Sequence, residues 1–136
     1  MRMLLGLLLL SGMTLGSVCG QSADTATVHF YRYRSGTAKM SKPPVYCDGI
    51  QLAKIRNGSV YTAQIPAGTH TFYSEYKPAG MRIRLEAGKE YYFRTDIDQS
   101  LGFWMVHFRL TEVEPDQGAF EIRSLKPLAT KTSAIR

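Results

Sequence analysis

The chain has 136 residues and carries 17 lysines and arginines against 11 aspartates and glutamates, a formal net charge of +6. This length suits one domain whose core is large enough to fold without a metal or a disulfide. The positive charge is modest and spread out, whereas nucleic-acid-binding proteins gather it on one face or stripe. We therefore expect no nucleic-acid partner; attraction to anionic lipid or polysaccharide stays open.

The first 20 residues predict a secretory signal peptide. Met1-Arg2-Met3 is short and positively charged, residues 4–10 are almost continuously apolar, and small residues then lead to Gly20. This order is typical of export signals, and the apolar run is well short of the about 20 residues that a membrane-spanning helix needs. We expect cleavage after Gly20 and a mature protein without a transmembrane helix. Its expected location is the periplasm or cell envelope, with an extracellular location as the alternative.

Cys19 offers a second interpretation, in which it is acylated and kept as the first residue of a lipoprotein. Such signals usually have Leu three positions before the cysteine and a small residue directly before it, but Gly16 and Val18 stand there. We therefore favour simple cleavage and keep lipidation of Cys19 as the alternative. Cleavage leaves Cys47 as a single cysteine, and its apolar flanks predict a buried, inert thiol.

The rest of the chain alternates short β-type runs with turn residues. The runs are rich in β-branched and aromatic residues and cover residues 27–33, 45–47, 50–55, 59–65, 69–76, 81–85, 90–96, 103–113 and 119–125. Asp48-Gly49 and Asn57-Gly58 favour two-residue hairpins, and Pro66-Ala67-Gly68 predicts a further turn. In residues 81–85 the alternation puts Met81, Ile83 and Leu85 toward the core.

This pattern predicts an all-β fold, a single antiparallel β-sandwich of about 8–9 short strands. The sandwich should span residues 27–125, after a leader at residues 21–26. Residues 115–118 should form a turn. Residues 126–136 should form a mobile C-terminal tail, because they show no hydrophobic periodicity and contain no aromatic residue.

Five segments in fixed order carry a family resemblance: Val28-His29-Phe30-Tyr31-Arg32, Val45-Tyr46-Cys47-Asp48-Gly49, Asn57-Gly58-Ser59-Val60-Tyr61, Ile65-Pro66-Ala67-Gly68-Thr69-His70 and Glu86-Ala87-Gly88-Lys89-Glu90-Tyr91-Tyr92-Phe93-Arg94. With them the chain resembles the bacterial domain of unknown function 2846 family, whose members are similar to PEGA-like envelope sandwiches. Cys47 stands where the family usually has Val, which fits a packed thiol. The resemblance implies an exported or lipid-anchored envelope protein and no catalytic residues.

The residues themselves show no catalytic set either. His29, His70 and His107 lack the spacing of a recurrent metal site, and His70 can instead satisfy the backbone of the preceding turn with a ring nitrogen. No Gly-x-Ser-x-Gly motif is present, and Asp96 and Asp98 are too few oxygen ligands for a calcium loop. We expect no enzyme activity, no cofactor and no metal.

Tyrosines and arginines are the remaining functional signal. Arg82, Arg84, Tyr92 and Trp104 make the candidate binding face, since such side chains bury area at low entropic cost. Cross-strand pairing that stabilises an exposed sheet face explains the same composition. We expect a non-catalytic binding or structural module of the bacterial envelope, with an envelope protein or a polysaccharide as the partner. The alternative is a small-ligand or carbohydrate-binding domain that stacks its ligand on Trp104 or Tyr92.

Overall fold

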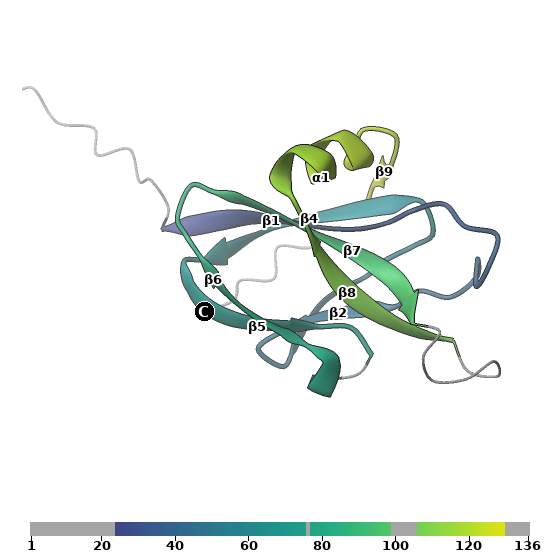
Figure 1. The fold of residues 1–136 in the computed structure, drawn as a ribbon, viewed down its shortest axis with the longest axis horizontal. Coiled ribbons are helices and arrows are strands. Elements are labelled where there is room, and N and C mark those ends of the chain that lie inside the picture. The colour runs from purple at the N-terminus through teal and green to yellow at the C-terminus, as the bar shows by residue number, and fades with distance from the viewer. Residues whose placement is uncertain (1–23, 76, 99–105, 130–136) are drawn as a thin grey trace, which may run out of the picture.

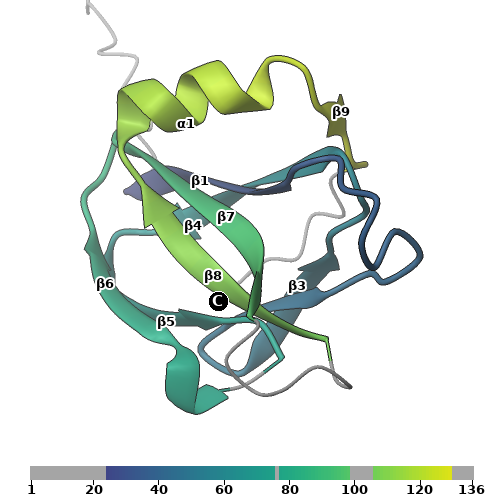
Figure 2. The same cartoon turned by 45° about the vertical axis from the view of Figure 1, so that its right-hand side comes forward.

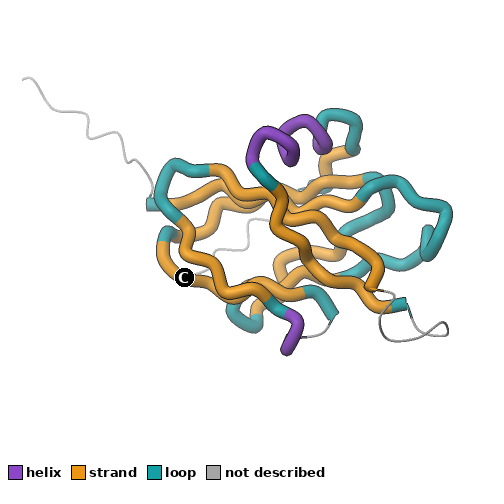
Figure 3. Tube along the Cα trace, in the orientation of Figure 1, coloured by secondary structure: helices purple, strands orange, loops and turns teal. Residues whose placement is uncertain are grey.

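Two β-sheets pack face to face, and one short helix crosses the outer side of one of them (Figure 1). The computed structural model describes residues 24–75, 77–98 and 106–129. The elements are β1 (Thr25–Arg32), β2 (Pro44–Cys47), β3 (Ile50–Lys54), β4 (Ser59–Pro66), β5 (Gly68–Tyr73), the 3₁₀ turn Lys77–Ala79, β6 (Met81–Leu85), β7 (Glu90–Asp98), β8 (His107–Val113), α1 (Pro115–Ile122) and β9 (Lys126–Pro127). The mostly β fold is confirmed, and Figure 3 shows how far strands dominate it.

One of the two sheets is mixed, so the prediction of a purely antiparallel sandwich was wrong. The five-stranded sheet has the order β8-β7-β1-β4-β9, and the four-stranded sheet has the order β3-β2-β5-β6. β1 pairs with β4 antiparallel but with β7 parallel, and β9 runs parallel to β4. β7 starts at the same end as β1 because the chain returns there from the other sheet. At this end Thr25 O accepts from Gly88 N–H, and Lys89 O accepts from Thr27 N–H.

Among the described strands, consecutive ones pair at β2–β3, β5–β6 and β7–β8. Asp48 and Gly49 have φ of 50° and 84°, the two positive values that a type I′ turn requires, so this predicted hairpin is confirmed. Asn57-Gly58 does not make a hairpin, because it joins β3 and β4, which belong to different sheets. A short Asx-Gly turn is compatible with either connection, and only the packing of the sheets chooses between them.

The core between the sheets centres on three phenylalanines. Phe30, Phe72 and Phe93 come from β1, β5 and β7, with ring centroids 5.1–5.7 Å apart. Leu85 is buried, and Met81 and Ile83 pack against the same core, as the alternation in β6 predicted. The aromatic contacts tie the two sheets together at their middle.

Helix α1 replaces the predicted turn at residues 115–118 and most of the predicted strand at 119–125. It lies across the outer face of the five-stranded sheet (Figure 2). Gly118, Ala119, Glu121 and Ile122 face the sheet at helical spacing, whereas Phe120 is 69% exposed. A second small core under α1 holds Tyr31, Val60, Tyr92 and Val113, packed against Ala119, Ile122 and Leu125.

The start of the predicted tail is also ordered. Lys126 and Pro127 form β9 beside β4, where Gly58 O accepts from Lys126 N–H and Val60 O accepts from Leu128 N–H. The predicted signal peptide with Cys19 and the cleavage position after Gly20, together with Trp104 and residues 130–136, lie outside the described part of the chain. Within that part, α1 is much too short to cross a bilayer and no other helix qualifies as a membrane span.

Candidate functional site

The loop between β1 and β2, residues 33–43, is held from inside by a buried arginine. Arg32 ends β1, is only 2% exposed, and stacks its guanidinium 4.7 Å from the ring centroid of Phe108. It donates hydrogen bonds to three loop carbonyls: Ser41 O at 2.7 Å, Ala38 O at 2.9 Å and Thr37 O at 3.4 Å. A buried charge needs such partners, so this contact fixes the path of the loop.

A second clamp joins this loop to the β3–β4 connection. The Asn57 side chain accepts from Ser35 N–H and donates to Ser35 O, both at 2.9 Å. Arg34 lies directly over Gly58, where an added Cβ would come within 3.4 Å of Arg34 Nε. Residues more than 20 positions apart in sequence are therefore neighbours here.

Between the loop and this connection lies a cavity of about 450 Å³, which we call the basic pocket. Its lining consists of Arg34, Lys39, Met40, Lys42, Arg56 and Asn57. Four of these residues are cationic and none is acidic, and none of the four cations forms an ion pair with any described residue. Met40 is 87% exposed among them. This arrangement attracts an anion and places an apolar side chain beside it.

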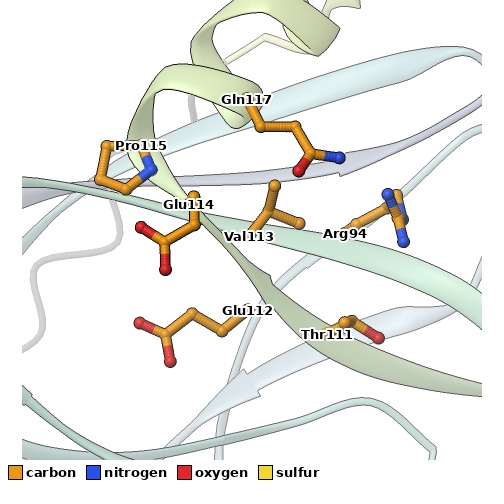
Figure 4. Close-up of a pocket in the computed structure, with 7 residues that line it drawn as sticks. All are labelled: Arg94, Thr111, Glu112, Val113, Glu114, Pro115 and Gln117. Atoms are coloured by element: carbon orange, nitrogen blue, oxygen red, sulfur yellow. The ribbon is translucent and has the colours of Figure 1, made fainter.

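A second cavity, of about 290 Å³, opens where β8 leads into α1 (Figure 4). Arg94 and the carboxylates of Glu112 and Glu114 lie on its opposite sides. Arg94 Nε is 2.9 Å from Asp96 Oδ1, and its Nη1 is 3.4 Å from Glu121 Oε1. Since its charge is already matched by these two carboxylates, the cavity is a poor anion site. Its lining is Arg94, Thr111, Glu112, Val113, Glu114, Pro115 and Gln117.

Glu121 anchors α1 to the sheet and is not poised for chemistry. It is 8% exposed, accepts a hydrogen bond from the Tyr31 hydroxyl, and accepts another from Gln117 Nε2 at 2.7 Å. Burial opposes its ionisation, but hydrogen bonds from Tyr31, Tyr33 and Gln117 and the charge of Arg94 outweigh burial and lower its pKa. Burial and the bond to Glu121 raise the pKa of Tyr31. A carboxylate held ionised by these hydroxyl and amide donors and by Arg94 stabilises the fold without serving as an acid.

The three histidines do not converge. His29 contacts Thr62 through Nδ1 at 2.8 Å and stacks on Tyr92, while His107 lies 3.8 Å from Glu75. His70 Nε2 is 2.7 Å from Pro66 O, so the predicted role of His70 in satisfying the preceding turn is confirmed.

His70 also lies beside Cys47, which sequence reasoning did not reveal. Cys47 Sγ is 3.8 Å from His70 Nδ1 and 3.8 Å from Asp48 Oδ2, and Nδ1 and Oδ2 are 2.6 Å apart. The predicted packing of Cys47 is confirmed, because it is fully buried. Burial and the neighbouring Asp48 carboxylate raise the pKa of its thiol to about 12. The thiol is therefore protonated at neutral pH and is not an activated nucleophile.

Among the described residues of the predicted binding face, Tyr92 does not lie with Arg82 and Arg84 on one surface. Arg82 and Arg84 are exposed on β6, an edge strand of the four-stranded sheet. Tyr92 belongs to the other sheet and is only 3% exposed under α1, so it is not a surface residue. Tyr46 and Tyr73 stack across β2 and β5 with centroids 4.9 Å apart, which is the cross-strand pairing of the alternative interpretation. Trp104 is outside the described residues.

Sequence reasoning missed the basic pocket because its cations sit in a loop and a turn that are distant in sequence. The available signal was the density of basic residues in 32–42 with no acidic residue between them. It became a site only through Arg32 and Asn57, which bring residues 34–42 against residues 56–57.

Comparison with known proteins identifies a family over most of the chain. Residues 22–107 match the family described as "Protein of unknown function (DUF2846)". The match covers β1 to β7 and ends at the first residue of β8. No curated protein matches the chain, and no solved structure matches it.

Proposed function

Because this chain belongs to the DUF2846 family, whose description assigns no activity, we propose its function from the basic pocket. The protein is an exported, non-catalytic binding module of the bacterial envelope that attaches to anionic lipid headgroups. The observation that carries the proposal is the convergence of four cations on one cavity whose lining includes no acidic residue. The expected signal peptide at residues 1–20 supports export, and a protonated, buried Cys47 supports a non-catalytic role.

A lipid headgroup fits better than a soluble anion because of Met40. This side chain is exposed next to Lys39 and Lys42 and can enter the boundary of the acyl chains while the lysines contact phosphate. The loop that carries all three is already tied down by Arg32, so little conformational entropy is lost on binding. Each basic residue near an anionic bilayer contributes about 1 kcal/mol.

The test is co-sedimentation of the chain from Gln21 onward with vesicles. We expect binding to phosphatidylglycerol–phosphatidylcholine vesicles, none to phosphatidylcholine alone, and weakening by salt through screening. Replacing Lys39 and Lys42 together by Ala should lower the association constant roughly 30-fold, which corresponds to two residues at about 1 kcal/mol each.

The matched control removes the same charge elsewhere, with Arg82 and Arg84 replaced together by Ala. This variant should bind nearly as the wild type does. If it loses as much affinity as the lysine variant, the interaction follows net charge or the β6 edge and not the basic pocket. Binding to an acidic polysaccharide without binding to vesicles would overturn the lipid assignment in favour of a glycan ligand.

The alternative of an aromatic carbohydrate platform has less support. Tyr92 is buried, and Tyr46 and Tyr73 stack on each other. A platform would rest on Trp104, and quenching of its fluorescence by added oligosaccharide tests that alternative directly.

A further inference from the structure

Three different donor atoms meet at the β2–β3 hairpin. Cys47 Sγ, Asp48 Oδ2 and His70 Nδ1 all lie within 4.8 Å of one another. Cys47 ends β2, Asp48 begins the turn, and His70 lies on β5, which pairs with β2. Thiolate, imidazole and carboxylate are together the donor set that zinc prefers, whereas calcium and magnesium select oxygen ligands.

The backbone orients two of these ligands in the manner of a metal site. Asp48 Oδ1 accepts from Thr71 N–H at 2.8 Å, which leaves Oδ2 to face the cluster. His70 Nε2 contacts Pro66 O at 2.7 Å, and a proton on Nε2 leaves the lone pair of Nδ1 directed at the same point. In zinc sites the ligating histidine commonly donates its other ring N–H to a backbone carbonyl in this way.

The separations are close to those of a tetrahedral zinc site. Ligands at the usual zinc distances are roughly 3.6 Å apart for sulfur to nitrogen or oxygen and roughly 3.3 Å apart for nitrogen to oxygen. Here Cys47 Sγ is 3.8 Å from both His70 Nδ1 and Asp48 Oδ2. Nδ1 and Oδ2 are 2.6 Å apart, which is the distance of a hydrogen bond between them. Ligation therefore needs a shift of under about 1 Å by the Asp48 carboxylate. Its side chain is 43% exposed, so the carboxylate can move.

We propose that Cys47, Asp48 and His70 bind one zinc ion, with water as the fourth ligand on the solvent side of Asp48. Binding breaks the S–H bond of Cys47, and that proton passes to solvent. The proton shared between His70 Nδ1 and Asp48 Oδ2 also leaves. Proton and metal thus compete for one gap, and the hydrogen-bonded cluster is the metal-free form of the same site.

Cobalt is the probe, because a cysteine thiolate bound to Co²⁺ gives a charge-transfer absorption in the near ultraviolet. We expect this band at neutral pH with one equivalent of Co²⁺ added to the metal-free chain from Gln21 onward, and its loss on adding zinc. Zinc should also raise the midpoint of thermal unfolding, since it binds the native state. No vesicles are present, so the result is independent of the proposed lipid binding.

The decisive variant is Cys47→Val, which removes the sulfur and keeps an apolar side chain of similar size. It should fold, show no charge-transfer band, and bind zinc roughly 100-fold more weakly or worse. His29→Gln, a histidine outside the cluster, should keep the wild-type band. An absent band in the folded wild type, or an unchanged band in Cys47→Val, would show that the cluster is a hydrogen-bonded turn only.

Discussion

The hydroxyl of Tyr31 on β1 donates a hydrogen bond to the carboxylate of Glu121 on α1, and this bond joins the sheet to the helix across 90 positions of sequence. Both residues are buried, and Arg94, Gln117 and Tyr33 also interact with the carboxylate. The bond accounts for how an eight-residue helix keeps a fixed place on the sheet.

Removing either partner of this bond should destabilise the protein. Tyr31→Phe and Glu121→Leu should each lower the free energy of unfolding by about 1–3 kcal/mol, because a buried polar group loses its partner. Urea denaturation of the two single variants and the double variant measures their coupling. Strictly additive losses would show that the bond contributes nothing of its own.

Glu121 should also make stability depend on pH in acid. Its pKa is lowered in the folded state, while an unfolded glutamate titrates near about 4.3. The stabilisation is therefore present above that unfolded value and is lost as the pH falls toward the folded pKa. Urea unfolding should be measured at a series of pH values from neutral to acid. The free energy of unfolding should fall less steeply with decreasing pH in Glu121→Gln than in the wild type.

Asp48 is the control for the acid titration. Partial burial opposes its ionisation, but hydrogen bonds from Thr71 and His70 lower its pKa as well. Asp48→Asn should remove the contribution of Asp48 to the loss of unfolding free energy in acid, and it should leave the contribution of Glu121 in place. If Glu121→Gln follows the wild-type curve at every pH, the carboxylate is not held ionised by the fold.

Gly118→Ala should destabilise α1 even though alanine favours helices by about 1 kcal/mol over glycine. An added Cβ would overlap Cβ and Cγ of Tyr92 and lie 2.7 Å from Cδ1, so the helix must move off the sheet. We expect a loss of about 1–3 kcal/mol from overpacking, measured by urea denaturation. Asp116→Ala, at an exposed position of the same helix, should be nearly neutral. A stabilised Gly118→Ala would contradict the close contact.

Arg32→Met should release the loop that carries the basic pocket. The carbonyls of Thr37, Ala38 and Ser41 lose their donor, and limited trypsin digestion should cut faster after Lys39. Mass spectrometry of the fragments over time reports the rate of cleavage after Lys39. Arg34→Met, which removes a nearby charge without touching these carbonyls, should leave the rates unchanged; equal rates in all three proteins would mean that the loop is held by something else.

The Cys47 thiol should be unreactive in the native protein. It is fully buried and its pKa is raised to about 12, so both access and ionisation oppose reaction with a disulfide reagent such as Ellman's. In the chain without Cys19, one thiol should react in urea and almost none in native buffer. A fast native reaction would place the sulfur at the surface.

Local sequence was enough for most strands and several turns of this protein. Alternation places Met81, Ile83 and Leu85 inward, and Asp48-Gly49 adopts the two positive φ values of a type I′ hairpin. These features depend on neighbours within a few residues, through side-chain period and backbone sterics. His70 belongs to the same class, because its bond to Pro66 O spans one turn.

The remaining features depend on segments that meet only after folding. The parallel pairing of β1 with β7, the helix in place of the last predicted strand and the burial of Tyr92 beneath it all follow from how one sheet is covered. A helical and an alternating pattern are hard to tell apart over eight residues, so packing against Tyr31 and Tyr92 decided for α1. Sequence by itself determined the β-rich fold and the hairpin turn, whereas the tertiary structure decided where charge gathers. Arg32 could be recognised as the buried anchor of the basic pocket only when its carbonyl partners were in place.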